Sequence, residues 1–149
     1  ANRDLYDPAA QAGSRGDAEQ GRERKMSETL DNYKARFRYS RAKVLRIVDG
    51  DTFDCLLDLG FGVFTKKRIR MWGINTPEKR TRDLNEKRMG KAASAALETH
   101  LEGGVCDIES LSIGKYGRVL GIAWVNGVNV NKEMLKTEGT TEYYGGKRR

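Results

Sequence analysis

The segment "RIRMWGINTPEKR" (residues 68–80) contains four side chains suited to phosphate chemistry around a single proline. Arg70 comes first, and an amide, a hydroxyl and a carboxylate follow in Asn75, Thr76 and Glu78. A guanidinium group donates paired hydrogen bonds to phosphate oxygens, because its N–H groups form a planar fork. A carboxylate such as Glu78 can accept a proton from an attacking water molecule. The segment therefore predicts a site that hydrolyses a phosphate ester.

A divalent cation is the third requirement of this chemistry, because it neutralises charge on the phosphate in the transition state. Such cations prefer oxygen ligands. The turn "VDGDT" supplies Asp51, and the later segment supplies the side-chain oxygen of Asn75 and the backbone carbonyl of Thr76. We therefore predict that these three residues are the metal ligands.

Two further segments add groups that could contact a nucleotide. "GKYGR" contains Lys115, Tyr116 and Arg118, and "EYYGGKRR" contains Tyr143 and Tyr144 before a basic terminus. Each segment alone has a simpler interpretation, since such turns are common and an exposed ion pair contributes less than about 1 kcal/mol. Their occurrence together, in this order between predicted strands, favours one functional site.

The composition supports an anionic partner. The 149 residues include 28 Lys and Arg against 21 Asp and Glu, a net charge of +7, and nucleic acid is the commonest partner of a basic domain. Cys55 and Cys106 form neither a metal motif nor a disulfide framework, so we predict that both are buried, reduced thiols. No apolar run is long enough for a membrane span, and we expect no membrane association and a monomer.

The sequence also lacks a signal-peptide pattern. We therefore expect an intracellular role in a bacterium or a phage, while a secreted mature form stays an alternative.

Hydrophobic periodicity predicts a mainly β domain. Residues 1–32 are polar and lack a period, which predicts a flexible tail before a domain at residues 33–149. Strand patterns occur at residues 34–39, 44–58 with a turn at Asp49–Gly50, 61–74, 105–113 and 118–125. One longer helix is predicted near residues 84–101 and a short one near 131–138. This order is typical of a five-stranded OB-fold barrel with two packed helices.

These motifs resemble the staphylococcal nuclease (thermonuclease) family, and the similarity extends from about Arg41 to about Gly139. The resemblance rests on "IVDGDTF", "RIRMWGINTPE", "EKRMGKAASAALETHLE" and "GKYGRVLGIAWVNGVNVNKEML". It implies an OB-fold that cleaves DNA and RNA with calcium. It also implies that Arg70 and Arg118 are the catalytic arginines and that Glu78 is the general base.

The resemblance assigns further roles at the same positions. Asp51 becomes the first metal aspartate with Asp49 behind it, and Thr76 provides the carbonyl ligand. Lys115 and Tyr116 become contacts to the terminal phosphate, and Tyr143 or Tyr144 becomes the residue that stacks on the base. In two places the sequence departs from the family pattern. Asn75 replaces the second metal aspartate, which leaves Mg²⁺ or Mn²⁺ as alternatives to Ca²⁺, and Gly114 replaces an acidic residue.

Two functional hypotheses follow. The first is a metal-dependent nuclease that attacks phosphorus with water, breaks the bond on the 5′-oxygen side and leaves 3′-phosphates. The second is a catalytically weak or inactive domain that binds nucleic acid or a protein, and the neutral Asn75 favours it. The enzyme is favoured because the sequence keeps four residues of the family pattern together: Asp51, Arg70, Glu78 and Arg118.

Overall fold

The computed structural model describes residues 28–145. The chain divides into two units, residues 1–33 and 34–149. In the first unit, Thr29 and Asn32 exchange backbone hydrogen bonds across a tight turn. The predicted tail lies mostly outside the described residues, as do the basic residues 147–149, so its flexibility stays a prediction.

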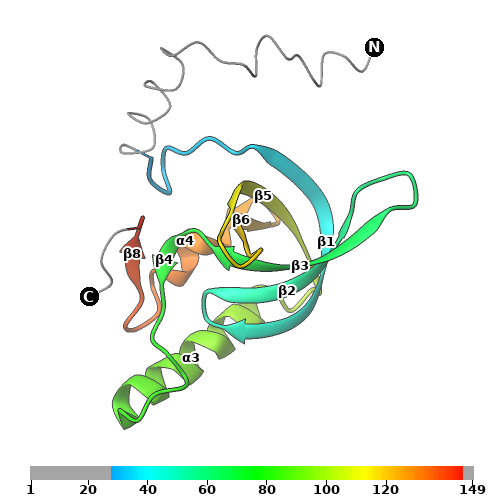
Figure 1. Ribbon diagram of the computed structural model, residues 1–149. Coiled ribbons are helices and arrows are strands. Elements are labelled where there is room, and N and C mark those ends of the chain that lie inside the picture. The colour runs from blue at the N-terminus through cyan, green and yellow to red at the C-terminus, as the bar shows by residue number, and fades with distance from the viewer. Residues whose placement is uncertain (1–27, 146–149) are drawn as a thin grey trace. The chain divides into compact units, whose positions relative to one another are not determined.

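Five strands of the second unit form a closed barrel (Figure 1). They are β1 (Phe37–Asp49), β2 (Thr52–Asp58), β3 (Phe64–Met71), β5 (Val105–Ile113) and β6 (Val119–Val125). Neighbours in the order β3-β2-β1-β5-β6 pair antiparallel, and a parallel pairing of β3 with β6 closes the barrel. This arrangement confirms the prediction of a mainly β, five-stranded OB-fold barrel.

Alternation along the strands explains the barrel core. In β2, Phe53, Cys55 and Leu57 are buried and face inward, while the residues between them face outward. Cys106 is buried as well, and neither cysteine forms a disulfide, as predicted. Burial raises the pKa of each thiol to about 12, so both cysteines remain neutral and act as small core residues.

The first strand differs from its prediction. Residues 34–39 and 44–49 were expected as separate strand patterns, but β1 runs unbroken from Phe37 to Asp49. Its pairing with β5 shifts register between Tyr39 and Ala42, where Arg41 has φ 56°. A bulge of this kind bends a strand without ending it, so the irregular pattern does not mark a boundary.

Two helices pack outside the strands. α3 (Leu84–His100) begins at Asp83, whose carboxylate accepts the N–H groups of Asn85 and Glu86. α4 (Val130–Met134) is shorter than predicted. Within residues 28–145, no helix combines the length and apolar character needed to span a membrane.

Three short strands also occur within residues 28–145: β4 (Gly73–Asn75), β7 (Val128–Asn129) and β8 (Thr141–Tyr143). β7 extends the main sheet beside β6. β4 and β8 pair with each other (Figure 1). Asn126 and Gly127 have φ 50° and 78° in the turn before β7.

Asn131 fixes α4 to the barrel through a buried amide. Its Oδ1 accepts the N–H of Ala123 at 3.0 Å, and its Nδ2 donates to the carbonyls of Trp72 at 2.7 Å and Gly121 at 3.0 Å. We predict that Asn131→Ala lowers the free energy of unfolding by about 3 kcal/mol, because buried backbone groups lose their partners. Denaturant unfolding provides the measurement.

The helix-capping residue Asn129 provides the control for this prediction. Its side chain accepts the N–H of Lys132 at 3.1 Å, and Asn129→Ala should cost about 1 kcal/mol. Equal losses from the two substitutions would contradict the role assigned to Asn131.

Candidate active site

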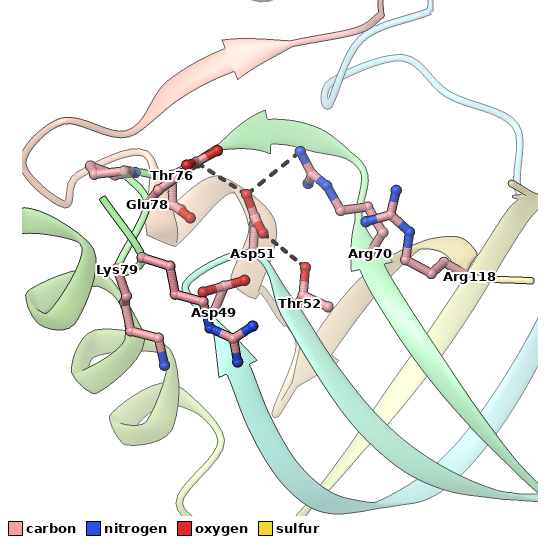
Figure 2. Close-up of a pocket in the computed structure, with 10 residues that line it drawn as sticks. Asp49, Asp51, Thr52, Arg70, Thr76, Glu78, Lys79 and Arg118 are labelled. Atoms are coloured by element: carbon pink, nitrogen blue, oxygen red, sulfur yellow. Dashed lines mark hydrogen bonds and ion pairs between the residues drawn. The ribbon is translucent and has the colours of Figure 1, made fainter. Parts of the chain in front are cut away.

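A pocket of about 230 Å³ opens where the ends of several strands meet. It collects residues from the β1–β2 turn, the end of β3, the segment after β4 and the residue before β6. The lining residues are Asp49, Asp51, Thr52, Arg70, Thr76, Pro77, Glu78, Lys79, Arg80 and Arg118 (Figure 2). Segments distant in the sequence therefore contribute to one site.

Strand pairing brings the two arginines together. Arg70 pairs with Thr52 on β2 and with Leu120 on β6, and Arg118 directly precedes β6. Figure 2 shows Arg70 and Arg118 on one side of Asp51, with Thr76 and Glu78 on the other. The pocket thus has two arginines on one side of Asp51 and a carboxylate together with Lys79 on the other.

Asp51 connects the parts of the pocket. Its Oδ1 accepts the hydroxyl of Thr52 at 2.9 Å, and its Oδ2 accepts the backbone N–H of Thr76 at 3.1 Å (Figure 2). The same Oδ2 lies 3.5 Å from Nη2 of Arg70. This buried carboxylate therefore joins the β1–β2 turn to the segment after β4 and orients an arginine.

Arg70 is held in place before any ligand binds. Its Nη1 donates to the carbonyl of Met71 at 2.6 Å, and only 15% of its side chain is exposed. A fixed guanidinium loses little conformational entropy when a phosphate binds, because that entropy is already lost on folding.

Small residues of α3 let both pocket turns approach the helix. A Cβ atom on Gly90 would lie 2.5 Å from the carbonyl carbon of Glu78 and 2.6 Å from the nitrogen of Lys79. A Cβ on Gly50 would lie 2.6 Å from Cβ of Ala93 and 3.1 Å from Cβ of Thr76. The backbone at Glu78 can therefore pack this closely against α3 only because residue 90 has no side chain.

On the hypothesis that this pocket hydrolyses phosphodiesters, Gly90→Ala should reduce kcat/KM by about tenfold to a hundredfold. The added methyl group must displace the backbone of Glu78, and a shift of about 1 Å in a catalytic group can cost a hundredfold. Cleavage rates combined with a thermal unfolding curve provide the measurement.

Gly103→Ala is the matched control, because an added Cβ at Gly103 meets no atom within 4 Å. Its rate should equal that of the parent protein. A folded Gly90→Ala protein with the parental rate would show that α3 does not position Glu78.

The remaining predicted residues lie in different places. Asn75 is half-buried on β4, pairs with Thr141, and is absent from the residues that line this pocket. Lys115 and Tyr116 belong to the turn between β5 and β6, where Tyr116 is 86% exposed. The pocket therefore gathers Asp49, Asp51, Arg70, Thr76, Glu78 and Arg118, and it does not include Asn75, Lys115 or Tyr116.

Tyr143 and Tyr144 line a second pocket of about 200 Å³, which also includes Arg70 and Arg118. The pairing of β4 with β8 brings these tyrosines beside Trp72, whose ring centroid lies 5.0 Å from that of Tyr144. Sequence reasoning missed Trp72, because its neighbours suggested an ordinary strand. The two pockets share both arginines, so an aromatic surface adjoins the cationic one.

The donor groups in the first pocket fit a hard divalent cation in type, but they do not enclose one. Asp49, Asp51 and Glu78 line it with Thr76. However, among residues 28–145 no three acidic, histidine or cysteine side chains form a group able to hold a metal.

Comparisons with known proteins agree with this geometry. A family model for staphylococcal nuclease homologues matches residues 68–147. The chain is 32% identical over 100 residues to an uncharacterized protein of Bacillus anthracis, covering 65% of this chain and 44% of that protein. It is 34% identical over 86 residues to Protein ParB of Escherichia coli, covering 58% and 42%.

The chain is also 34% identical over 108 residues to Endonuclease YhcR of Bacillus subtilis, covering 66% of this chain and 8% of that protein. It therefore spans less than half the length of each of these relatives.

Proposed function

The chain belongs to the family of staphylococcal nuclease homologues, and from this premise we propose that it is a metal-dependent nuclease that hydrolyses phosphodiester bonds of DNA, RNA or both. The observation that carries the proposal is the shared pocket of Asp51, Arg70, Glu78 and Arg118. Two guanidinium groups and a carboxylate around one cavity match the charges that phosphoryl transfer requires.

In the proposed reaction, Arg70 and Arg118 bind non-bridging phosphate oxygens of a diester in the pocket. Glu78 accepts a proton from water as the water oxygen forms a bond to phosphorus. The bond from phosphorus to the 5′-oxygen breaks, by analogy with the family, and that oxygen takes a proton from solvent. The products carry a 3′-phosphate and a 5′-hydroxyl.

A divalent cation would be held by the carboxylate of Asp51 and the carbonyl of Thr76, with Asp49 behind them. Asn75, the third ligand expected from the sequence, lies on β4 outside the lining of this pocket. When bound, it would polarise a phosphate oxygen. Family resemblance favours Ca²⁺, with Mg²⁺ and Mn²⁺ as alternatives.

The aromatic pocket supports a place for the nucleotide base. Tyr143 and Tyr144 lie beside the two arginines that contact the phosphate, and aromatic rings stack on bases of any sequence. Lys115 and Tyr116 precede Arg118 in the same turn, where they would contact a terminal phosphate.

A domain that binds nucleic acid without cleaving it is the second candidate. The observation that favours it is Asp51, both of whose carboxylate oxygens accept hydrogen bonds from protein groups. On this view, the carboxylate maintains the fold of the pocket and catalyses nothing.

One assay separates the two candidates. Labelled single-stranded DNA and RNA are incubated with the protein in Ca²⁺, Mg²⁺, Mn²⁺ or chelator, beside the variant Arg118→Ala. Cleavage that stops with chelator and falls at least about a hundredfold in the variant supports the nuclease. Binding without products under every condition would support the second candidate.

A further inference from the structure

Basic side chains continue from the pocket along the outside of the barrel. We call the exposed residues Lys43, Arg46, Lys66 and Arg68 the outer track. Asp54 on β2 pairs with Arg46 on β1 and Arg68 on β3, and Leu56 pairs with Lys43 and Lys66. Because their neighbours on β2 face the core, these two rows face outward.

The outer track begins at the catalytic arginine. Arg70, Arg68 and Lys66 are alternate residues of β3 and share its outward face, so successive cations lie about 6.8 Å apart along the strand. This spacing is comparable with that of successive phosphates in an extended single strand. A strand that places one phosphate at Arg70 could therefore place the next ones at Arg68 and Lys66.

The charge of the track is only partly neutralised. Nε of Arg68 donates to Oδ1 of Asp54 at 2.8 Å and Nη2 to Oδ2 at 3.3 Å, yet 45% of the Arg68 side chain remains exposed. The hydrogen bond from Arg68, and then the charges of Arg68, Lys66 and Arg46, lower the pKa of Asp54. This carboxylate therefore remains ionised among the cations and orients one of them.

An aromatic side chain follows in the same row. Phe64 pairs with Asp58, is 57% exposed and occupies the next outward position of β3 after Lys66. It stands at the base of the β2–β3 hairpin, which projects from the barrel (Figure 1). Cations followed by an exposed aromatic ring are the combination by which proteins bind single strands.

We propose that the outer track binds the part of a single-stranded polynucleotide that leaves the catalytic pocket, with phosphates on the cations and a base on Phe64. The choice of ligand rests on the proposed function. The site itself is additional to the pocket, and it explains how a small pocket could retain a long substrate.

Binding without cleavage tests the track. The full chain carrying Glu78→Gln is titrated in chelator with fluorescent oligothymidylates of about 4 and about 16 nucleotides. Adding Lys43→Gln, Arg46→Gln and Lys66→Gln should weaken binding of the longer oligonucleotide about tenfold or more. The longer oligonucleotide should then bind little more tightly than the shorter one. The slope of log affinity against log salt should fall by about 2, for three lost phosphate contacts.

The matched control removes the same charge outside the outer track, through Arg88→Gln on α3, Lys132→Gln on α4 and Lys136→Gln just after α4. This control variant should still bind the longer oligonucleotide more tightly than the shorter one. Thermal unfolding curves should show that both triple variants are folded. Equal losses of affinity for the longer oligonucleotide in the two variants would overturn the proposal.

Phe64→Ala tests the aromatic contact, with Phe37→Ala as its control. Phe37 is similarly exposed at 55% but lines a different pocket, whose lining includes neither Phe64 nor any residue of the outer track. Only Phe64→Ala should weaken single-strand binding. A duplex bound as tightly as the single strand, with no effect of Phe64→Ala, would contradict the assignment.

These outcomes are separate from those for catalysis. If the parent protein cleaves nothing but the track variant loses affinity, the track is supported and the nuclease proposal fails. If the parent cleaves and the track variant binds like its control, the nuclease stands and the track is overturned.

Discussion

Replacing Arg70 with alanine should reduce kcat/KM for oligonucleotide cleavage by about a hundredfold to a thousandfold. Nη2 of Arg70 lies 3.5 Å from Oδ2 of Asp51, and the side chain is held by the carbonyl of Met71 as well. The substitution removes a fixed positive charge where the transition state accumulates negative charge. Steady-state cleavage of a labelled single strand provides the measurement.

Two further substitutions show whether this loss is specific. Arg70→Lys keeps the charge but loses the planar fork, so it should recover only part of the rate. Arg38→Ala removes an arginine that also pairs with a carboxylate on a barrel strand, at 3.7 Å from Glu109, but that lies outside the pocket, and it should leave the rate near that of the parent. If Arg70→Ala cleaved as fast as Arg38→Ala, phosphate binding by Arg70 would be refuted.

Replacing Glu78 with glutamine should slow cleavage by about a hundredfold to ten-thousandfold. Glutamine keeps the shape of the side chain but cannot accept the proton of the attacking water. Glu78 is exposed, and its backbone packs closely against Gly90 of α3. The fold should therefore tolerate a change of the side chain. Single-turnover cleavage at saturating protein separates this effect from substrate affinity, which should change little.

The control for this variant is Glu138→Gln, an exposed glutamate that pairs with Arg88 at 3.4 Å and lies outside the pocket. It should cleave at the parental rate. Glu78→Gln with an unchanged single-turnover rate would require another group to accept the proton.

The barrel was predictable because its strands are long enough to show alternation. Phe53, Cys55 and Leu57 identify the inner face of β2 without further information, and the apolar period of α3 identifies its packed face. The parallel pairing of β3 with β6 is different, because it joins residues 69–71 to 119–121 without a local pattern. Yet this closure is what places Arg118 beside Arg70.

The charged residues of the site were predictable from the sequence. The residues that position them were less so. Asp51, Arg70 and Glu78 stand out by chemistry, but the small size of Gly90 looks like any weak position in a helix. The β4–β8 pair has only three residues in each strand, too few for a recognisable period, so the position of Trp72 beside Tyr144 could not be foreseen. Asn75 shows the opposite case, since its chemistry suggested a ligand and the structure places it outside the pocket lining.

The central claim is that Arg70 and Glu78 act on the same phosphorus atom, and a double-variant cycle tests it most directly. Cleavage rates are measured for the parent, Arg70→Ala, Glu78→Gln and the combined variant, in the cation that supports the fastest cleavage. Residues that act as a unit in one transition state are strongly non-additive. The account predicts that the combined variant is much faster than the product of the two single losses would give. Fully multiplicative losses, or no cation-dependent cleavage by the parent, would contradict it.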